Sequence, residues 1–194
     1  MASSSGRSRG GRRPSVHVEP HGLFQTVQHY IGDIVYGAND GVLTSFAVVA
    51  GVTGGALSSQ TVIIVGIANL LADGLSMGVG NYLSIRARES ALEHQRRPEE
   101  EAHPVRHGAA TFIAFVIAGA VPLVPYFLSG IGRQFEWAVA CALATQFGVG
   151  AGRSAVTASR WWVSGLEMLA LGAVVAAVAY GTGATIASVA GSAP

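Results

Sequence analysis

Long apolar stretches alternate with short segments rich in charged and small polar residues along most of this chain. About 20 consecutive apolar residues form a helix long enough to cross the hydrocarbon core of a bilayer, which is about 30 Å thick. By this measure the pattern predicts five transmembrane helices. They cover residues 34–56, 61–83, 109–129, 135–152 and 162–181. The predicted fold is therefore an all-α integral membrane protein with a single transmembrane domain over residues 21–190.

The segments outside the predicted spans are polar and short. Residues 1–20 consist mostly of Ser, Gly, Arg and Pro, so we expect this tail to be disordered. The apolar residues Phe24, Val27 and Ile31 then recur at helical spacing among glutamines and a histidine, which predicts an interfacial amphipathic helix leading into the first span. Residues 84–108 are expected to form a short polar loop between the second and third spans.

Arginine placement predicts the orientation of the bundle. All twelve basic residues are arginines, and only Arg133 falls on the side opposite the other eleven. Because loops rich in basic residues stay in the cytosol, we expect a cytosolic N-terminus and loop 84–108, and a non-cytosolic C-terminus. A cleaved signal peptide is the alternative reading of the first span. The long polar leader and the carboxylate of Asp40 within the apolar stretch argue against it.

The composition agrees with a membrane protein and excludes other classes. Half of the 194 residues are apolar and only 12% are charged, too few to cover the surface of a soluble domain of this size. The formal net charge of +1 gives no electrostatic basis for a nucleic-acid partner. The single cysteine, Cys141, excludes an internal disulfide.

Carboxylates inside the predicted spans are the main functional signal. Each costs about 2.5–3.5 kcal/mol at the bilayer centre on the insertion scale, so a short protein that carries several has a use for them. Asp40, Asp73 and Glu167 lie in the first, second and fifth spans, and Asp33 stands at the mouth of the first. Helical spacing extends these residues into two polar stripes. The first stripe is Asp33, Gly37, Asp40 and Thr44, and the second is Asn69, Asp73, Ser76, Met77, Gly80 and Ser84.

Residues of the two stripes are predicted to lie at matching depths in the membrane. At about 1.5 Å per residue from the predicted cytosolic boundary, Asp40, Met77 and Glu167 lie at a similar depth, and Thr44 lies level with Asp73. Carboxylates supply charge, and a thioether favours a transition metal over Mg²⁺ or Ca²⁺. This arrangement predicts a site for a divalent transition-metal cation.

A packing role is the alternative for each of these polar residues, because polar and small side chains also hold membrane helices together. Gly37 and Gly41, and likewise Gly74 and Gly78, are spaced to permit close helix approach. Methionine is ordinarily a filler in membrane helices, so Met77 gains its predicted role only from the neighbouring carboxylates.

Two segments, YGANDGVLTSFAVVAG at 36–51 and GIANLLADGLSMGVGNYLS at 66–84, carry a specific resemblance. They resemble the vacuolar iron transporter family, which includes yeast-type calcium/iron accumulators and plant nodulin-21-like proteins. The similarity extends over roughly residues 24–185. It implies a homodimer of five-helix chains that exports Fe²⁺ or Mn²⁺ from the cytosol, in exchange for protons. It also implies a translocation site that includes Asp33, Asp40 and Met77.

This sequence departs from the family pattern in two respects. The resemblance implies an acidic residue at the position of Asn69 in plant vacuolar members and at the position of Asn81 in many relatives, so this site has less charge there, which Asp73 offsets in part. The long glutamate-rich metal-binding domain of full-length members is missing between the second and third helices, as it is in the shorter nodulin-like branch.

The remaining loop still carries residues able to recruit metal near the predicted cytosolic mouth. The candidates are Glu89, Glu93, His94, His103 and His107, accompanied by Glu99, Glu100 and Glu101. A solvated loop is the stronger alternative, because five arginines are interspersed and Pro98 and Pro104 interrupt a helix that would align the ligands. We expect His17, His21 and His29 to be interfacial or solvated.

These observations together predict a secondary-type metal ion transporter, not an enzyme, with no permanently bound cofactor. Its expected partners are the lipid bilayer, Fe²⁺ or Mn²⁺, protons and a second copy of the chain. We expect the dimer interface to include the face of Gly37 and Gly41 and to enclose the path. The expected location is the inner membrane of a bacterium, or a vacuolar or other organelle membrane of a eukaryote.

Two other functions are alternatives to transport. A phosphatidyltransferase is disfavoured because Asp40-Gly41 is followed by Val-Leu-Thr-Ser instead of Ala-Arg. A structural or assembly protein of the membrane is the open alternative.

Overall fold

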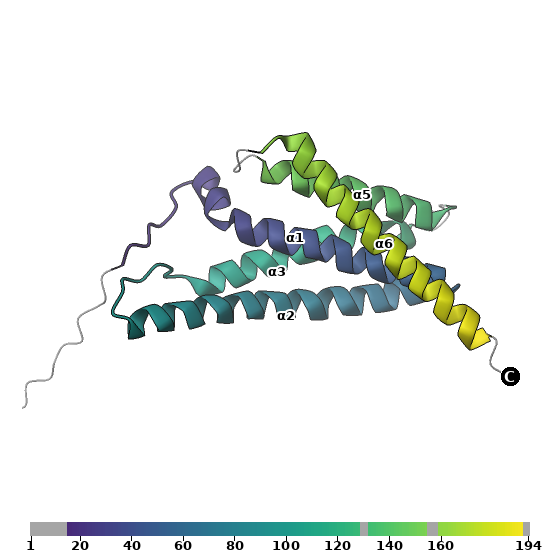
Figure 1. The fold of residues 1–194 in the computed structure, drawn as a ribbon, viewed down its shortest axis with the longest axis horizontal. Helices are drawn as coiled ribbons and strands as arrows, with labels where there is room; N and C mark the ends of the chain where they lie inside the picture. Colours follow the sequence, from purple (N-terminus) through teal and green to yellow (C-terminus); the bar gives the residue numbers. More distant parts are fainter. Residues whose placement is uncertain (1–14, 129–131, 155–158, 192–194) are drawn as a thin grey trace, which may run out of the picture.

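The computed structural model describes residues 15–128, 132–154 and 159–191, which form a bundle of long helices (Figure 1). The elements in chain order are α1 (Leu23–Gly54), α2 (Ser59–His94), α3 (Pro104–Ala120), the 3₁₀ turn η1 (Val121–Leu123), α4 (Val124–Phe127), α5 (Gln134–Arg153) and α6 (Trp161–Gly191). The α3, η1 and α4 elements follow one another without a break and act as one helical segment. The predicted all-α class is confirmed.

Four helical segments of the described chain are long and apolar enough to cross a membrane. They are Phe24–Gly54, Ser59–His94, Pro104–Phe127 and Trp161–Gly191. The predicted span 135–152 does form the helix α5, but this helix is not among the four. Polar residues such as Glu136 and Gln146 lower its hydropathy, although its 20 residues correspond to about 30 Å of helix. A membrane crossing by α5 stays a prediction.

The helices extend further than the apolar stretches do. The expected interfacial helix and the first span form one continuous helix, α1. The α2 helix does not end at residue 83 but continues to His94, so the expected loop 84–108 shortens to 95–103. Residues 84–94 are polar, yet most of them favour a helix, and an apolar-stretch criterion cannot detect that. Pro98 lies in the short connection, and Pro104 opens α3, where its missing N–H has no cost.

The expected disorder of residues 1–20 is wrong for its last part. Ser15 pairs with Glu99 in an isolated β-bridge, and the backbone N–H of Val16 donates to the carbonyl of Glu99 at 2.9 Å. Residues 15–20 therefore lie against the connection between α2 and α3. Residues 1–14 lie outside the described part of the chain.

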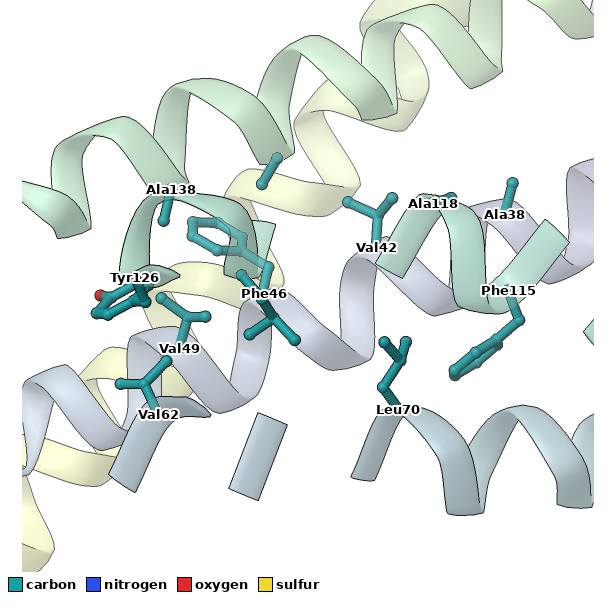
Figure 2. Close-up of a cluster of buried hydrophobic side chains, with 12 residues drawn as sticks. Ala38, Val42, Phe46, Val49, Val62, Leu70, Phe115, Ala118, Tyr126 and Ala138 are labelled. Carbon is teal, nitrogen blue, oxygen red and sulfur yellow. The ribbon is translucent and has the colours of Figure 1, made fainter. Parts of the chain in front are cut away.

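The central helix is α1, which contacts α2, α3, α5 and α6. Figure 2 shows its side chains Val42, Phe46 and Val49 among Val62 and Leu70 of α2, Phe115 and Ala118 of α3, and Ala138 of α5. Both Phe46 and Phe115 are almost completely buried. This packing fixes the position of α1 relative to α2, α3 and α5.

The backbones of α1 and α3 touch at two glycines of α1, and at these positions there is no space for a side chain. A Cβ atom on Gly37 would lie 2.4 Å from the carbonyl oxygen of Thr111, and one on Gly41 would lie 2.3 Å from that of Phe115. Both contacts are within the chain, so the expectation that this glycine face forms the dimer interface is wrong: α3 covers it. The α2 and α3 helices approach similarly, with a Cβ on Gly78 falling 2.8 Å from the carbonyl oxygen of Gly108 and one on Gly74 falling 3.0 Å from the Phe115 ring.

We predict that Gly41→Ala destabilises the single chain. The added methyl overlaps the Phe115 carbonyl, and overpacking of this kind costs about 1–3 kcal/mol or more. The matched control is Gly32→Ala on the same helix, where a Cβ meets nothing within 4 Å. Thermal unfolding of both variants in detergent tests this. Equal melting temperatures for the two variants would contradict the close contact.

Candidate functional site

Only part of the two predicted polar stripes comes together between α1 and α2, because Gly37 packs against α3 and Ser76, Gly80 and Ser84 are exposed. The Asp40 carboxylate lies within electrostatic range of the Asp73 carboxylate, and both residues are partly buried. The side-chain amide of Asn69 donates to Oδ2 of Asp73 at 2.8 Å. The Thr44 hydroxyl donates to the backbone carbonyl of Asp40 at 2.9 Å, not to its carboxylate. Met77 packs, partly buried, against the hydrophobic core.

Asp33 is held at the mouth of this stripe by residues from two other helices. The Asn81 side-chain amide donates to Oδ1 of Asp33 at 2.7 Å, and Nδ1 of His107 lies 2.5 Å from Oδ2. The same amide of Asn81 also donates to the Thr111 hydroxyl at 2.8 Å. Asn81 therefore joins α1, α2 and α3. A carboxylate at position 81 could donate neither bond when ionised.

The axial register of α1 and α2 differs from the predicted depths, which place Asp40 level with Met77. Asp33 is bonded to Asn81, so in an antiparallel pair Asp40 lies level with the turn that carries Asp73. The shift is about one helical turn. It arises because both helices continue past the ends of their apolar stretches, from which the depths were counted.

The predicted depth of Glu167 places it level with Asp40 and Met77, but in the structure it pairs with an arginine. Its Oε2 accepts from Nη2 of Arg153 at 3.0 Å, and its side chain is 63% exposed in the single chain. This ion pair joins α6 to the end of α5. The sequence assigned Arg153 to the segment after the fourth span, and the structure places it in the last turn of α5.

A cluster of histidines and carboxylates lies beyond Asp33, where residues 15–20, α1 and the α2–α3 connection meet. Oε2 of Glu101 lies 2.8 Å from Nε2 of His107 and 3.3 Å from Nε2 of His29. Oε1 of Glu101 lies 3.4 Å from Nδ1 of His17. His17 was expected to be interfacial or solvated, and the solvated alternative does not hold, because its side chain is only 6% exposed. We name these four residues the mouth cluster.

The mouth cluster could be traced only in part from the sequence. His29 and Asp33 are four residues apart on α1 and share a helical face, whereas His103 precedes α3 and only His107 lies on that helix. His17 was missed because the tail was expected to be disordered. In an extended segment, alternate residues point the same way, which places Glu19 beside His17. Glu19 forms ion pairs with His103 and Arg106.

The Glu101 carboxylate is held as an anion. Its burial alone would raise the pKa, but the backbone N–H of His103, which donates to Oε1 at 2.9 Å, and the imidazoles of His107 and His17 outweigh that effect. The pKa of Glu101 therefore lies below its ordinary value. An ionised carboxylate facing several imidazole nitrogens can bind either protons or a cation.

The other predicted recruitment residues have different positions. Glu89 is buried and accepts backbone N–H groups of Glu100 and Glu101, at 3.1 and 2.8 Å, so it shapes the connection. Glu93 and His94 are exposed at the end of α2. Of the residues predicted to recruit metal, His107 lies against Asp33 and His103 lies against Glu19.

Comparison with known proteins agrees with the predicted resemblance. A sequence model of the VIT family matches residues 31–103 and 91–184. The vacuolar iron transporter of Toxoplasma gondii is 43% identical over 84 residues, which make up 43% of this chain and 27% of that protein. Vacuolar iron transporter 1 of Arabidopsis thaliana is 34% identical over 103 residues, 53% of this chain and 40% of that protein. Vacuolar iron transporter 1 of Eucalyptus grandis is 26% identical over 230 positions, with 89% of this chain and 91% of that protein covered.

The extent of these matches is uneven. The chain spans less than half the length of the Toxoplasma and Arabidopsis proteins. The Eucalyptus alignment has more positions than the 194 residues of this chain, so that relative has segments that this chain lacks. The two parts of the family match meet at residues 91–103, around the α2–α3 connection. All three relatives are named as vacuolar iron transporters.

We predict that Asn81→Ala destabilises the protein by about 1–3 kcal/mol, because it leaves partly buried partners on α1 and α3 without their hydrogen bonds. Asn69→Ala is the matched control, since Asn69 bonds Asp73 within α2 and holds no second helix. Thermal unfolding in detergent compares the two. If Asn69→Ala lowered the melting temperature as much as Asn81→Ala, Asn81 would not join the three helices as described.

Proposed function

This chain belongs to the VIT family, and on that premise we propose that it exports a divalent transition-metal ion, Fe²⁺ or Mn²⁺, from the cytosol. The observation that carries the proposal is that Asp40 on α1 and Asp73 on α2 are both partly buried and, in the register set by the Asn81–Asp33 bond, lie at the same level within electrostatic range of each other. Both helices are long and apolar enough to span a bilayer, where two neighbouring carboxylates are costly unless they share a cation or protons. A purely structural membrane protein gives no reason for that arrangement.

The proposed metal path begins at Asp33 and continues to Asp40 and Asp73. Carboxylate oxygens supply the charge that attracts a divalent cation from water. The Asn69 amide and the Met77 thioether are the neutral ligands in the same stripe, and the thioether favours a transition metal over Mg²⁺ or Ca²⁺. Glu167, which pairs with Arg153, is proposed as a later ligand that must first leave that ion pair.

A second copy of the chain completes the path in this proposal. Ser76 of the α2 stripe is exposed in the single chain, and Asn69 and Asp73 are only partly buried. Polar groups facing lipid are unfavourable, so another protein surface is the suitable cover. Since α3 already covers Gly37 and Gly41, we place the dimer contact along the open edge of α1 and α2.

The topology proposed from the arginines fits this arrangement. The start of α1, the end of α2 and the start of α3 lie at the same end of the bundle (Figure 1). Arg86 and Arg88 on α2 and Arg106 on α3 lie at this end, which we place in the cytosol. With α5 as a fifth crossing, the C-terminus lies on the opposite side of the membrane.

We predict that Asp40→Asn abolishes metal flux, because the amide keeps the shape of the side chain but not its charge. Purified protein in liposomes, with a metal-sensitive dye inside, measures Fe²⁺ and Mn²⁺ uptake. Glu136→Gln is the control, since it neutralises an exposed carboxylate that is paired with Arg133 outside the stripe. Flux at the normal rate in Asp40→Asn would exclude Asp40 from the path.

We predict that metal flux responds to an imposed pH gradient. Metal and protons compete for the same carboxylate oxygens, so release of metal at the far side is favoured where protons are abundant. Liposomes acidified on the side that receives metal should therefore accumulate more Mn²⁺ than liposomes without a gradient. Uptake that does not change when the gradient is imposed or collapsed would count against proton exchange.

A further inference from the structure

The mouth cluster joins three segments that are far apart in the sequence. His17 belongs to the extended segment before α1, His29 lies in the second turn of α1, and Glu101 lies in the α2–α3 connection. Ligand atoms of these three side chains all lie within 4.8 Å of one another. Neutral imidazole and carboxylate are the ligands that Zn²⁺ and other first-row transition metals accept.

The distances within this set fit shared coordination better than direct hydrogen bonds. Nδ1 of His17 and Nε2 of His29 lie 3.4 and 3.3 Å from the two oxygens of Glu101. A charge-assisted N–H···O bond would be about 2.7–2.9 Å long. Two ligand atoms on one tetrahedral ion, each about 2.0–2.1 Å from the metal, lie roughly 3.4 Å apart.

Unsatisfied nitrogens in the same place point independently to a ligand. Nε2 of His29, the nitrogen that faces Glu101, is buried and forms no hydrogen bond with the described residues. Nε2 of His17 is likewise buried without a hydrogen bond, but it is the other nitrogen of that ring and lies 3.8 Å from Oε1 of Glu19. The His17 side chain is 94% buried, at 6% exposure, so water does not readily satisfy it. A buried polar atom without a partner costs about 1–3 kcal/mol, and a bound ion removes that cost for a nitrogen that turns towards it.

We infer that His17, His29 and Glu101 form a binding site for one first-row transition-metal ion at the mouth of the path. Glu19 and His103 form a neighbouring set with His17 and are the nearest source of a fourth ligand. The ligand set contains two nitrogens, which disfavours Mg²⁺ and Ca²⁺ relative to Fe²⁺, Co²⁺ or Zn²⁺. This site is separate from the Asp40–Asp73 pair and uses none of its residues.

One imidazole connects the site to the path. Oε2 of Glu101 lies 2.8 Å from Nε2 of His107, whose Nδ1 lies 2.5 Å from Oδ2 of Asp33. An ion held by Glu101 is thus separated from the Asp33 carboxylate by a single side chain. The site is placed to load the path with metal. That role rests on the proposed function, whereas metal binding itself does not.

Co²⁺ binding to the full chain in detergent tests the site directly. The titration uses Asp40→Asn protein, in which the proposed path is weakened, and follows visible Co²⁺ absorption together with equilibrium dialysis. We expect one Co²⁺ per chain with a tetrahedral-type spectrum. Adding His29→Ala should weaken this binding by about tenfold or more, since even outer partners of a metal contribute about 10–100-fold.

The matched control is His21→Ala, because His21 is an exposed histidine just before the same helix and takes no part in the cluster. Glu101→Gln is the second test variant, since it keeps the shape of the side chain and loses its charge. Elution profiles in detergent establish that each variant is folded. Co²⁺ binding in His29→Ala and Glu101→Gln that equals binding in His21→Ala would overturn the site.

Flux measurements separate this inference from the proposed function. Introduced into the otherwise unchanged chain, His29→Ala should raise the Fe²⁺ concentration needed for half-maximal uptake and leave the maximal rate unchanged. Weakened Co²⁺ binding together with normal flux in Asp40→Asn would refute the proposed path and keep the site. Unchanged Co²⁺ binding in the His29 and Glu101 variants, with flux abolished in Asp40→Asn, would refute the site and keep the path.

Discussion

The backbone contact of α1 with α3 is the constraint on which the other positions depend. Gly37 meets Thr111 and Gly41 meets Phe115, so each step of four residues on α1 matches a step of four on α3. The pair one turn earlier is Asp33 and His107, which fits the same series. Two helices that run in the same direction with this register cannot slide or rotate without an overlap of backbone atoms. The Asp33 carboxylate is therefore positioned by Gly37 and Gly41, which carry no functional group themselves.

Because of this contact, different faces of α1 have different roles. One face lies against α3, and another packs Val42 and Phe46 into the core. The remaining face turns Asp40 towards α2, whose polar stripe is only partly covered. A membrane helix this crowded can bear a carboxylate only where a partner, a cation or a second chain receives it. The same reasoning explains why Asp33 receives bonds from two helices instead of one.

Apolar stretches predicted the helices well, because helix formation depends largely on local sequence, whereas the two stripes stay a prediction. The ends of α1 and α2 were missed, since polar residues that favour a helix continue it beyond the apolar stretch. The dimer role given to Gly37 and Gly41 was wrong because glycine spacing indicates close approach without identifying the approaching helix. The mouth cluster depends on His17, which reaches Glu101 only after residues 15–20 fold against the α2–α3 connection. Tertiary contacts of that kind leave almost no local signal.

The short connection 95–103 is a place where the length of the chain can vary. It joins the ends of α2 and α3 outside the contact between α1 and α3, so its length can change without altering the register of either helix. The family match divides at this point, and the longer relatives have segments that this chain lacks. A gain or loss of residues within α1, by contrast, would rotate every later residue by about 100° per position. A change of length at the connection can therefore leave the pairing of Asp33 with His107 intact.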